Sequence, residues 1–329
     1  MRIAILGAGA WGTALAGTLA ARHEAVLWAR DAGQAAQIAA AGCNQRYLPG
    51  HQLPARLHVT ADLEAALRHA RGSLLLLAVP IASLRPLLAE IARSSHDGAL
   101  AWLCKGLERD SGLLAHQIVA ELLPGVAAGP LSGPSFAEEV ALGLPTALVA
   151  AGSAAFCATV TAAVHGGNLR VYSSDDVVGV EVGGAVKNVL AIATGIADAL
   201  QLGLNARAAL ITRGLNETRR FGMALGANSE TFTGLTGMGD LILTCTGDLS
   251  RNRRIGLELG RGVPLAQAMA ELGHVAEGVW CAPAIVARAR TLQVEMPISS
   301  TVCDVLEDRA GVRDAVDRLL ARDPRAERS

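Results

Sequence analysis

The feature that most constrains this chain is the motif Gly7-Ala8-Gly9-Ala10-Trp11-Gly12, close to the N-terminus. It directly follows the apolar run Arg2–Leu6 and opens a helical pattern over Gly12–Ala21. In a strand–turn–helix unit the first glycine permits a tight turn, the second lets the backbone approach a pyrophosphate, and the third allows close packing. The helix N-terminus offers N–H groups to the anion. The motif therefore predicts a dinucleotide-binding turn; a glycine-rich turn without a ligand is the alternative.

The first half of the chain, to about residue 172, alternates short apolar runs with amphipathic stretches. This alternation is typical of βαβ units and predicts a Rossmann-type α/β domain around a parallel sheet. The expected strands are Arg2–Leu6, Ala25–Ala29, Leu57–Thr60, Leu74–Val79, Ala99–Cys104, Ala127–Ser132, Thr146–Ala150 and Leu169–Val171, and the helices between them include Gly12–Ala21 and Leu113–Leu123.

From about Val180 the strand-like runs give way to helical periods, which predicts an all-helical C-terminal domain. The expected helices are Val180–Leu200, Arg207–Leu225, Arg253–Leu259, Pro283–Leu292 and Thr301–Leu306. The polar run Tyr172–Asp176 is the expected hinge. We therefore expect a dinucleotide-binding domain over residues 1–178 and a substrate-binding, catalytic domain over residues 179–329. The charged end, Arg322–Ser329, is expected to fray.

Composition excludes several classes of protein. With 51% hydrophobic and 18% charged residues the chain is not a disordered polyelectrolyte, and 29 basic against 30 acidic residues leave no global field for nucleic acid or anionic lipid. The six cysteines form no C-x-x-C pair, so we expect reduced thiols and no metal site. The charge-free apolar stretch Leu74–Leu84 is too short to span a bilayer. We expect a cytoplasmic protein without a membrane span.

The end of the second strand usually selects between the two nicotinamide cofactors, and here it is Trp28-Ala29-Arg30-Asp31. An arginine at this point accommodates the 2′-phosphate of NADP, whereas an acid binds the free 2′-hydroxyl of NAD. Arg30 therefore favours NADP(H), and Asp31 leaves NAD possible. Arg30 could equally be a solvated side chain at a strand end.

Two further segments follow expected strands, at the sheet edge where ligands of open α/β sheets bind. Lys105 comes directly after the run Ala99–Cys104, although a lysine there can also mark the point at which the chain surfaces. Ser135 and Glu138 have the spacing of a helix capping box, and that helix N-terminus could also serve a ligand.

Lys187 lies in a stretch without other charges between Val182 and Ala197. Its helical neighbours at i±3 and i±4 are Gly183, Gly184, Leu190 and Ala191, so we expect a partly buried ammonium group with room for a ligand to approach. Desolvation lowers the pKa of a lysine and suits it to general acid–base work near neutral pH. The alternative is a lysine that extends along its stem to solvent.

Charged groups in two later segments complete the candidate site. Asp240 lies among small residues and could orient or neutralise a catalytic lysine. The run Ser250-Arg251-Asn252-Arg253-Arg254 joins three guanidinium groups to an expected helix start with Ser250 as its cap, which suits a phosphate. A solvated basic face is the alternative. Nucleic acid is disfavoured because no aromatic residues interleave with the arginines.

Taken together, these segments resemble the bacterial-type NAD(P)-dependent glycerol-3-phosphate dehydrogenases over nearly the whole chain. The blocks that carry the resemblance are Gly7–Gly12, Lys105–Glu108, Ser132–Glu139, Gly183–Val189, Asn205–Gly214, Gly239–Leu241, Ser250–Arg253, Ala276–Gly278 and Glu295–Ile298. Ala10 stands where relatives often have serine and Ala276 where many have valine; neither change removes the backbone donors to the pyrophosphate.

The resemblance implies a role for each matching position. Lys187 matches the catalytic proton acceptor of alcohol oxidation, and Lys105 a lysine that contacts both substrate and cofactor. Substrate-contacting positions are Lys105, Gly133, Ser135, Lys187, Asp240, Ser250, Arg251 and Asn252; cofactor-contacting positions are Gly7, Gly9, Ala10, Trp11, Gly12, Arg30, Lys105, Ala137, Arg251, Val275 and Glu277. The resemblance also implies a homodimer and a place in phospholipid synthesis.

The expected reaction is reversible hydride transfer between NAD(P)H and carbon 2 of dihydroxyacetone phosphate, which gives sn-glycerol 3-phosphate. Arg251 and Asn252 would hold the phosphate, and Lys187 would exchange the hydroxyl proton. Lys105 and Asn188 would polarise the carbonyl, and Asp240 would lie beside the two lysines. We expect no metal in this reaction. Two alternatives remain: a dehydrogenase of another 2- or 3-hydroxy compound, and a non-catalytic dinucleotide sensor.

Overall fold

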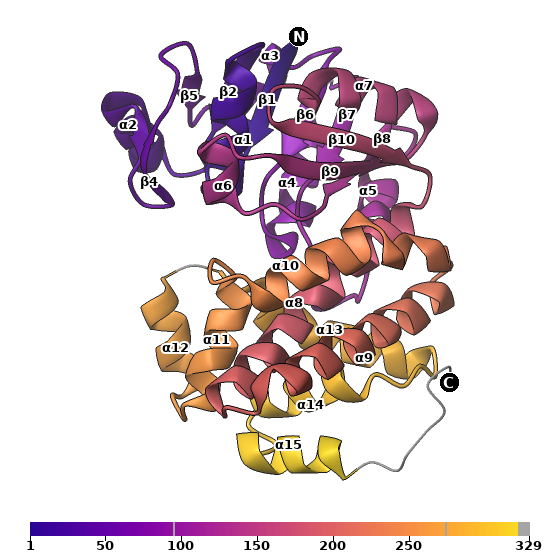
Figure 1. Ribbon diagram of the computed structural model, residues 1–329. Coiled ribbons are helices and arrows are strands. Elements are labelled where there is room, and N and C mark those ends of the chain that lie inside the picture. The colour runs from indigo at the N-terminus through magenta and orange to yellow at the C-terminus, as the bar shows by residue number, and fades with distance from the viewer. Residues whose placement is uncertain (95, 274, 322–329) are drawn as a thin grey trace.

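The structure is a computed structural model that describes residues 1–94, 96–273 and 275–321 (Figure 1). An α/β domain precedes a domain built of helices, as predicted. The charged end Arg322–Ser329 lies outside the described residues. The boundary predicted at residue 178 falls at the start of the helix that enters the second domain, and it stays a prediction.

An eight-stranded sheet with the order β10-β9-β8-β7-β6-β1-β2-β5 forms the centre of the α/β domain. Its strands match the predicted runs within a few residues. They are β1 (Arg2–Leu6), β2 (Glu24–Trp28), β5 (His58–Thr60), β6 (Leu74–Leu77), β7 (Ala99–Trp102), β8 (Ala128–Ser132), β9 (Thr146–Ala151) and β10 (Leu169–Ser174). β10 includes part of the expected hinge. A separate hairpin, β3 (Cys43–Asn44) and β4 (Leu48–Gln52), was not predicted.

The expectation of a wholly parallel sheet is wrong for one pair of strands. β8 and β9 pair antiparallel, with Leu131 opposite Ala150, whereas the other strand pairs of this sheet are parallel. The segment between them carries only the short helix α6 (Ala137–Ala141), so the chain turns back at the same edge of the sheet. Apolar runs mark buried strands but do not encode their direction.

Alternating side chains of the sheet face two layers of helices. Ile3 and Ile5 of β1 pack with α1 (Ala10–Ala20), α2 (Ala32–Ala41) and α7 (Ala154–Val164). Ala4 and Leu6 face the other way, toward the layer that contains α3 (Leu63–His69), α4 (Leu84–Ala92) and α5 (Ala115–Leu122). Because both faces are covered, the strands can be apolar throughout.

The helical domain is arranged around α8 (Val177–Ala199). The other α-helices are α9 (Gly203–Ala224), α10 (Asp240–Thr246), α11 (Arg251–Gly260), α12 (Leu265–Leu272), α13 (Glu277–Thr291), α14 (Pro297–Leu306) and α15 (Val312–Leu320). In length and hydropathy α8 could cross a membrane, but 89% of its apolar window is buried inside the protein. α8 is therefore the core helix of this domain.

Several predicted helices begin too late, and the difference is largest for the helix predicted to start at Pro283. Pro283 was expected to start a helix, but it lies inside α13, which begins at Glu277. Proline lacks an N–H and is favoured in a first turn, which made it a reasonable start signal. Here buried residues on both sides of the proline, including Val279 and Ile285, anchor the helix in the core.

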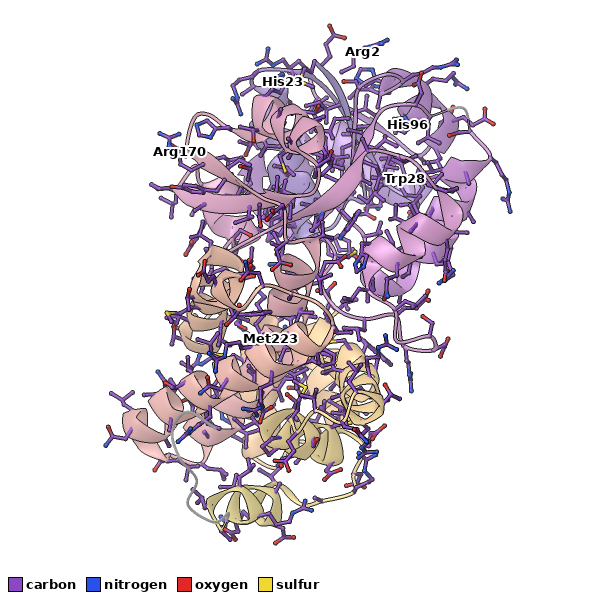
Figure 2. The ribbon with its side chains drawn as sticks, turned by 90° about the vertical axis from the view of Figure 1, so that its right-hand side faces the viewer. Arg2, His23, Trp28, His96, Arg170 and Met223 are labelled. Carbon is purple, nitrogen blue, oxygen red and sulfur yellow. The ribbon has the colours of Figure 1, made fainter. Side chains whose placement is uncertain are left out.

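The carboxyl edge of the sheet faces the helical domain. Figure 2 shows Arg2, the first residue of β1, at the end of the molecule remote from the helical domain, which carries Met223. Parallel strands share their direction, so the segments that follow β1, β6, β7 and β8 meet at the junction of the two domains.

Candidate active site

The dinucleotide-binding turn has the geometry that its glycines predict. Gly7 adopts a φ of +123°, and a Cβ there would lie 2.4 Å from the carbonyl oxygen of Ala78. A Cβ on Gly12 would lie 1.9 Å from the carbonyl oxygen of Gly7, so helix and strand could not pack. A Cβ on Gly9 would instead meet nothing within 4 Å. The turn thus leaves open space in front of the first N–H groups of α1, starting at Ala10, and this space fits a pyrophosphate.

The two side chains at the end of β2 differ in what they do. Asp31 is the N-cap of α2, and its carboxylate accepts a hydrogen bond of 2.6 Å from the N–H of Gln34. Arg30 is exposed. The acid that left NAD possible is therefore engaged in capping, while the guanidinium group is accessible to a ligand.

Lys105 and Lys187 meet on one buried carboxylate, that of Asp240. Nζ of Lys105 donates to Oδ2 at 2.7 Å, and Nζ of Lys187 donates to Oδ1. Lys105 follows β7, Lys187 lies in the middle of α8, and Asp240 is the first residue of α10. The side chain of Lys187 is 9% exposed and that of Asp240 1%. The predicted burial of Lys187 is confirmed, and Asp240 lies where it can orient both lysines.

Burial and charge act in opposite directions on this cluster. Burial lowers the pKa of Lys187, the charge of Asp240 raises it in part, and the result is a pKa of about 7. Burial would raise the pKa of Asp240, but the Lys105 and Lys187 ammonium groups together lower it. The aspartate therefore stays ionised, while the Lys187 ammonium can lose its proton near neutral pH.

Thr244 belongs to the same cluster, and sequence reasoning missed it. Its Oγ1 accepts a hydrogen bond of 2.9 Å from Lys187 and donates to the carbonyl oxygen of Asp240 at 2.6 Å. Asp240 and Thr244 are one helical turn apart on α10, so the i, i+4 spacing was the available signal. An ammonium has three donors. Asp240 and Thr244 use two of those of Lys187, and the third is left for a substrate.

The glycines beside Lys187 were expected to leave room for a ligand, and this expectation is wrong: they make room for other parts of the protein. A Cβ on Gly183 would lie 2.2 Å from the carbonyl oxygen of Thr236, in the segment that leads into α10. A Cβ on Gly184 would lie 3.3 Å from Cγ of Lys105. These close approaches bring Asp240 and the stem of Lys105 to Lys187.

The loop after β8 differs from its predicted capping box. The N-cap of α6 is Phe136, without a side-chain hydrogen bond, so Ser135 does not cap this helix. Ser135 Oγ instead accepts a hydrogen bond of 3.2 Å from Trp11 Nε1 and donates to the carbonyl oxygen of Gly133 at 3.1 Å. That carbonyl also accepts from Lys105 Nζ at 3.3 Å. Ser135 therefore joins the dinucleotide turn to the lysine cluster. Ala137, the first residue of α6, is half-buried close by in the sequence.

The start of α11 carries the candidate phosphate ligands. Ser250 is the N-cap, as predicted, and its Oγ accepts from the N–H of Arg253 at 3.2 Å. Arg251, the first helical residue, is exposed. Asn252 is buried and donates to Oδ1 of Asn188 at 2.9 Å. Nδ2 of Asn188 is buried without a partner among the described residues, which leaves a donor for a ligand.

Glu277 and Val275 lie at the start of α13, on the other side of this cluster. Burial raises the pKa of Glu277, and the nearby charges of Arg251, Lys105 and Lys187 lower it in part. Val275 is 40% exposed. These interactions bring Glu277 into one electrostatic group with both lysines and Arg251.

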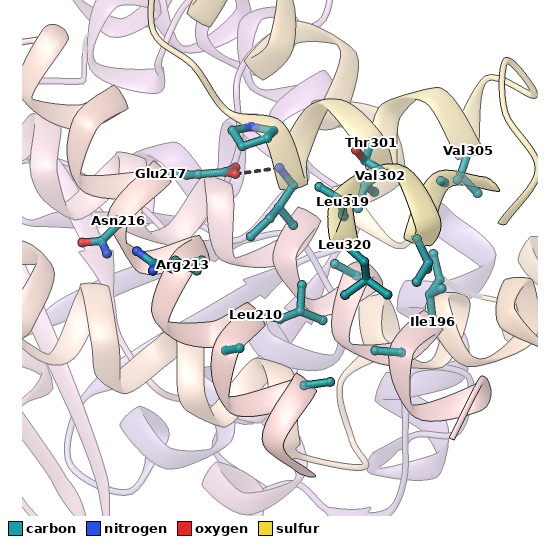
Figure 3. Close-up of a pocket in the computed structure, with 18 of the residues that line it drawn as sticks. Ile196, Leu210, Arg213, Asn216, Glu217, Thr301, Val302, Val305, Leu319 and Leu320 are labelled. Carbon is teal, nitrogen blue, oxygen red and sulfur yellow. Dashed lines mark hydrogen bonds between the residues drawn. The ribbon is translucent and has the colours of Figure 1, made fainter. Parts of the chain in front are cut away.

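A large cavity lies elsewhere in the helical domain. A space of about 780 Å³ between α8, α9, α14 and α15 is lined by apolar side chains such as Leu210 and Val302 (Figure 3). On its wall the carboxylate of Glu217 accepts from the backbone N–H of Ile298 at 2.6 Å, at the start of α14. Neither Lys105 nor Lys187 lines this cavity, so it is separate from the lysine cluster. No group of three or more potential metal ligands occurs among the described residues.

A dinucleotide turn and two lysines on one buried aspartate, at the same edge of a Rossmann-type sheet, define a nicotinamide-dependent dehydrogenase. The family comparison is more specific. The model described as NAD-dependent glycerol-3-phosphate dehydrogenase N-terminus matches residues 2–157, and the C-terminus model matches residues 176–317. The chain therefore belongs to this family, and the resemblance inferred from the sequence is confirmed.

Individual relatives match over the full length. The glycerol-3-phosphate dehydrogenase (NAD(P)+) of Paucimonas lemoignei is 61% identical and that of Methylibium petroleiphilum 57%, each covering 99% of this chain and 98% of the relative. The crystal structure of glycerol-3-phosphate dehydrogenase from Coxiella burnetii superposes with a TM-score of 0.93 at 42% identity, covering 97% of this chain and 98% of that one.

Proposed function

We propose that this protein catalyses the NAD(P)-dependent reduction of dihydroxyacetone phosphate to sn-glycerol 3-phosphate, and the reverse reaction. The observation that carries this function is the Lys187 ammonium, buried at the sheet edge between Asp240 and Thr244 with a pKa lowered to about 7. The full-length relatives named glycerol-3-phosphate dehydrogenase support the choice of substrate.

In the reduction, Lys187 donates the proton that the substrate oxygen on carbon 2 acquires. Two of its donors are fixed by Asp240 and Thr244, so the third has a defined direction. The fit of the dinucleotide turn to a pyrophosphate supports a bound nicotinamide nucleotide, which supplies the hydride. Lys105 and Nδ2 of Asn188, which has no hydrogen-bond partner among the described residues, stabilise the charge that develops on the oxygen. In the oxidation, neutral Lys187 accepts the hydroxyl proton.

The substrate phosphate would bind at the start of α11. Arg251 provides a fork of donors, Asn252 and Ser250 add neutral polar groups, and the helix N-terminus favours an anion. This phosphate is remote from the reacting carbon, and its binding energy orients that carbon toward the nicotinamide. Gly133 and Ser135 would line the other side of the substrate.

The cofactor would lie over Gly7, Gly9, Ala10, Trp11 and Gly12, with Ala137, Val275 and Glu277 as further contacts. Accessible Arg30 favours NADPH, and the engagement of Asp31 as a helix cap supports this preference. We further propose a cytoplasmic homodimer that supplies glycerol phosphate for phospholipid synthesis.

A spectrophotometric assay tests the function. Oxidation of NADPH and NADH should depend on added dihydroxyacetone phosphate, with the higher kcat/KM for NADPH. Cofactor binding without turnover would instead indicate a dinucleotide sensor.

Arg251→Met separates a phosphorylated from an unphosphorylated substrate. The KM for dihydroxyacetone phosphate should rise roughly 10- to 100-fold, because a hydrogen bond to a charged group contributes about 1.5–3 kcal/mol. The matched control is Arg254→Met, one helical turn after Arg251. It removes an exposed guanidinium that binds the backbone carbonyl of Asp248. The KM of this variant should stay within about twofold of the unaltered protein. Equal KM values for the two variants would contradict the proposal that the substrate phosphate binds at the start of α11.

A further inference from the structure

Asp198, at the end of α8, is held between two arginines from different helices. Its Oδ2 accepts from Nε and Nη2 of Arg253 on α11, at 3.0 and 2.8 Å. Its Oδ1 accepts from Nε of Arg207 on α9 at 2.7 Å. The side chains of Asp198 and Arg253 are 10% and 11% exposed. None of these three groups takes part in the chemistry above, yet together they tie three helices.

Arg253 lies in the helical turn that carries the candidate phosphate ligands. Its backbone N–H donates to the cap Ser250, and it follows Arg251 and Asn252 directly. Its other ion-pair partner, Asp248, is 94% exposed and lies on the loop before α11. The buried contact with Asp198, in which two guanidinium N–H groups bind one carboxylate oxygen, is therefore the stronger constraint on this turn.

The backbones of α8 and α11 touch where the arginine is anchored. A Cβ on Gly195 would lie 2.2 Å from the carbonyl oxygen of Arg253, and one on Gly256 would lie 2.1 Å from that of Ile192. Glycines permit this approach but have no side chains that interlock. Polar contacts on either side of the crossing, Asn188–Asn252 and Asp198–Arg253, therefore fix the position of α11 along α8.

We propose that Asp198 is a positioning residue for substrate phosphate binding: it holds Arg253, and through it the first turn of α11 with Arg251 and Asn252. This inference rests on the proposed phosphate site at that turn. Without the charge on Asp198, Arg253 keeps only the exposed Asp248, and the turn moves away from the lysine cluster.

Asp198→Asn keeps the shape of the side chain and removes its charge. The KM for dihydroxyacetone phosphate and the Ki of glycerol 3-phosphate should rise together, about tenfold. The kcat should stay within about twofold because Lys187 is unchanged, and the Kd for NADPH should rise less than the KM because the dinucleotide turn is unchanged and Arg251 is only one of the cofactor-contacting positions. Asp248→Asn is the matched control: it removes the exposed carboxylate from the same Arg253 and should leave all four constants within about twofold.

If Asp198→Asn does not fold, a second pair of variants tests the same inference. Arg253→Met and the double variant Asp198→Asn/Arg253→Met leave no unpaired buried guanidinium on α11. If Asp198 acts through Arg253, the two should show the same raised KM. A double variant whose KM exceeds that of Arg253→Met tenfold would overturn the inference.

The remaining outcomes separate this inference from the proposed function. If Arg251→Met raises the KM but Asp198→Asn does not, Asp198 has no positioning role and the phosphate site stands. If Asp198→Asn changes kcat and the NADPH Kd as much as the KM, its role is general stability and the inference fails. If Arg251→Met leaves the KM unchanged, the phosphate site itself is wrong.

Discussion

The chain contains only two lysines, Lys105 and Lys187, and both bind the carboxylate of Asp240. The uncharged surroundings of Lys187 predicted its burial, and Asp240 was a candidate partner because it lies among small residues. For Thr244 the available signal was its i, i+4 spacing from Asp240, and this signal is weak because a threonine in an apolar helix has many possible roles. The capping role of Ser135 was predicted wrongly because a hydroxyl before a helix can bind elsewhere, here to Trp11.

At the scale of single residues, the lowered pKa of Lys187 predicts opposite pH dependences for the two directions. Reduction needs the protonated ammonium, so its kcat should fall as pH rises through about 7. Oxidation needs the neutral amine, so its kcat should rise over the same range. Steady-state kcat between pH 5.5 and 9 with saturating substrates measures both. Profiles that are flat across pH 7, or that run in the same direction, would contradict the role of Lys187.

Elements were predicted more completely than their connections. Runs such as Leu74–Leu77 and Ala99–Trp102 are apolar because both faces of the sheet are covered, and this pattern is visible in the sequence. No comparable apolar pattern in the sequence marks the reversed direction of β9 or the hairpin of β3 and β4. The start of α13 before Pro283 depends on packing against the core, which overrides the local signal.

At the scale of elements, the glycines at which α8 and α11 cross should not tolerate replacement by a residue with a side chain. Gly195→Ala would place a Cβ 2.2 Å from the carbonyl oxygen of Arg253, and overpacking of this kind costs about 1–3 kcal/mol. The gain in helix propensity, about 1 kcal/mol, offsets only part of this cost. A lower urea midpoint, followed by circular dichroism, is the expected result.

The control is Gly17→Ala in α1, where a Cβ would lie 3.3 Å from the tip of Leu53 and in ordinary contact, at 3.9 Å, with Cδ of Pro54. The side chain of Leu53 can give way, so the variant should keep the urea midpoint or raise it slightly. If Gly195→Ala were as stable as Gly17→Ala, the close crossing of α8 and α11 would not be a constraint on the domain.

At the scale of the molecule, a polar contact between Glu181 and His116 ties the two domains, in addition to the ion pair of Lys105 with Asp240. Glu181 on α8 is buried, and its carboxylate accepts from the backbone N–H of His116 at 2.9 Å and binds the imidazole of the same residue. This contact joins the first turn of α5 to the helix that carries Lys187. The order of α/β and helical halves was predictable from periodicity, but such a contact between distant segments was not.

The placement of Lys187 at the junction of the domains is the central claim, and its consequence is a lysine that titrates far below the ordinary value of 10.5. Because the chain has two lysines, the NMR spectrum of protein labelled with ¹³C at lysine Cε contains two lysine signals. One of them should titrate with a pKa near 7 and disappear in Lys187→Arg, which retains the charge. If the signal lost in Lys187→Arg titrates near 10.5 in the unaltered protein, Lys187 is not the proton carrier.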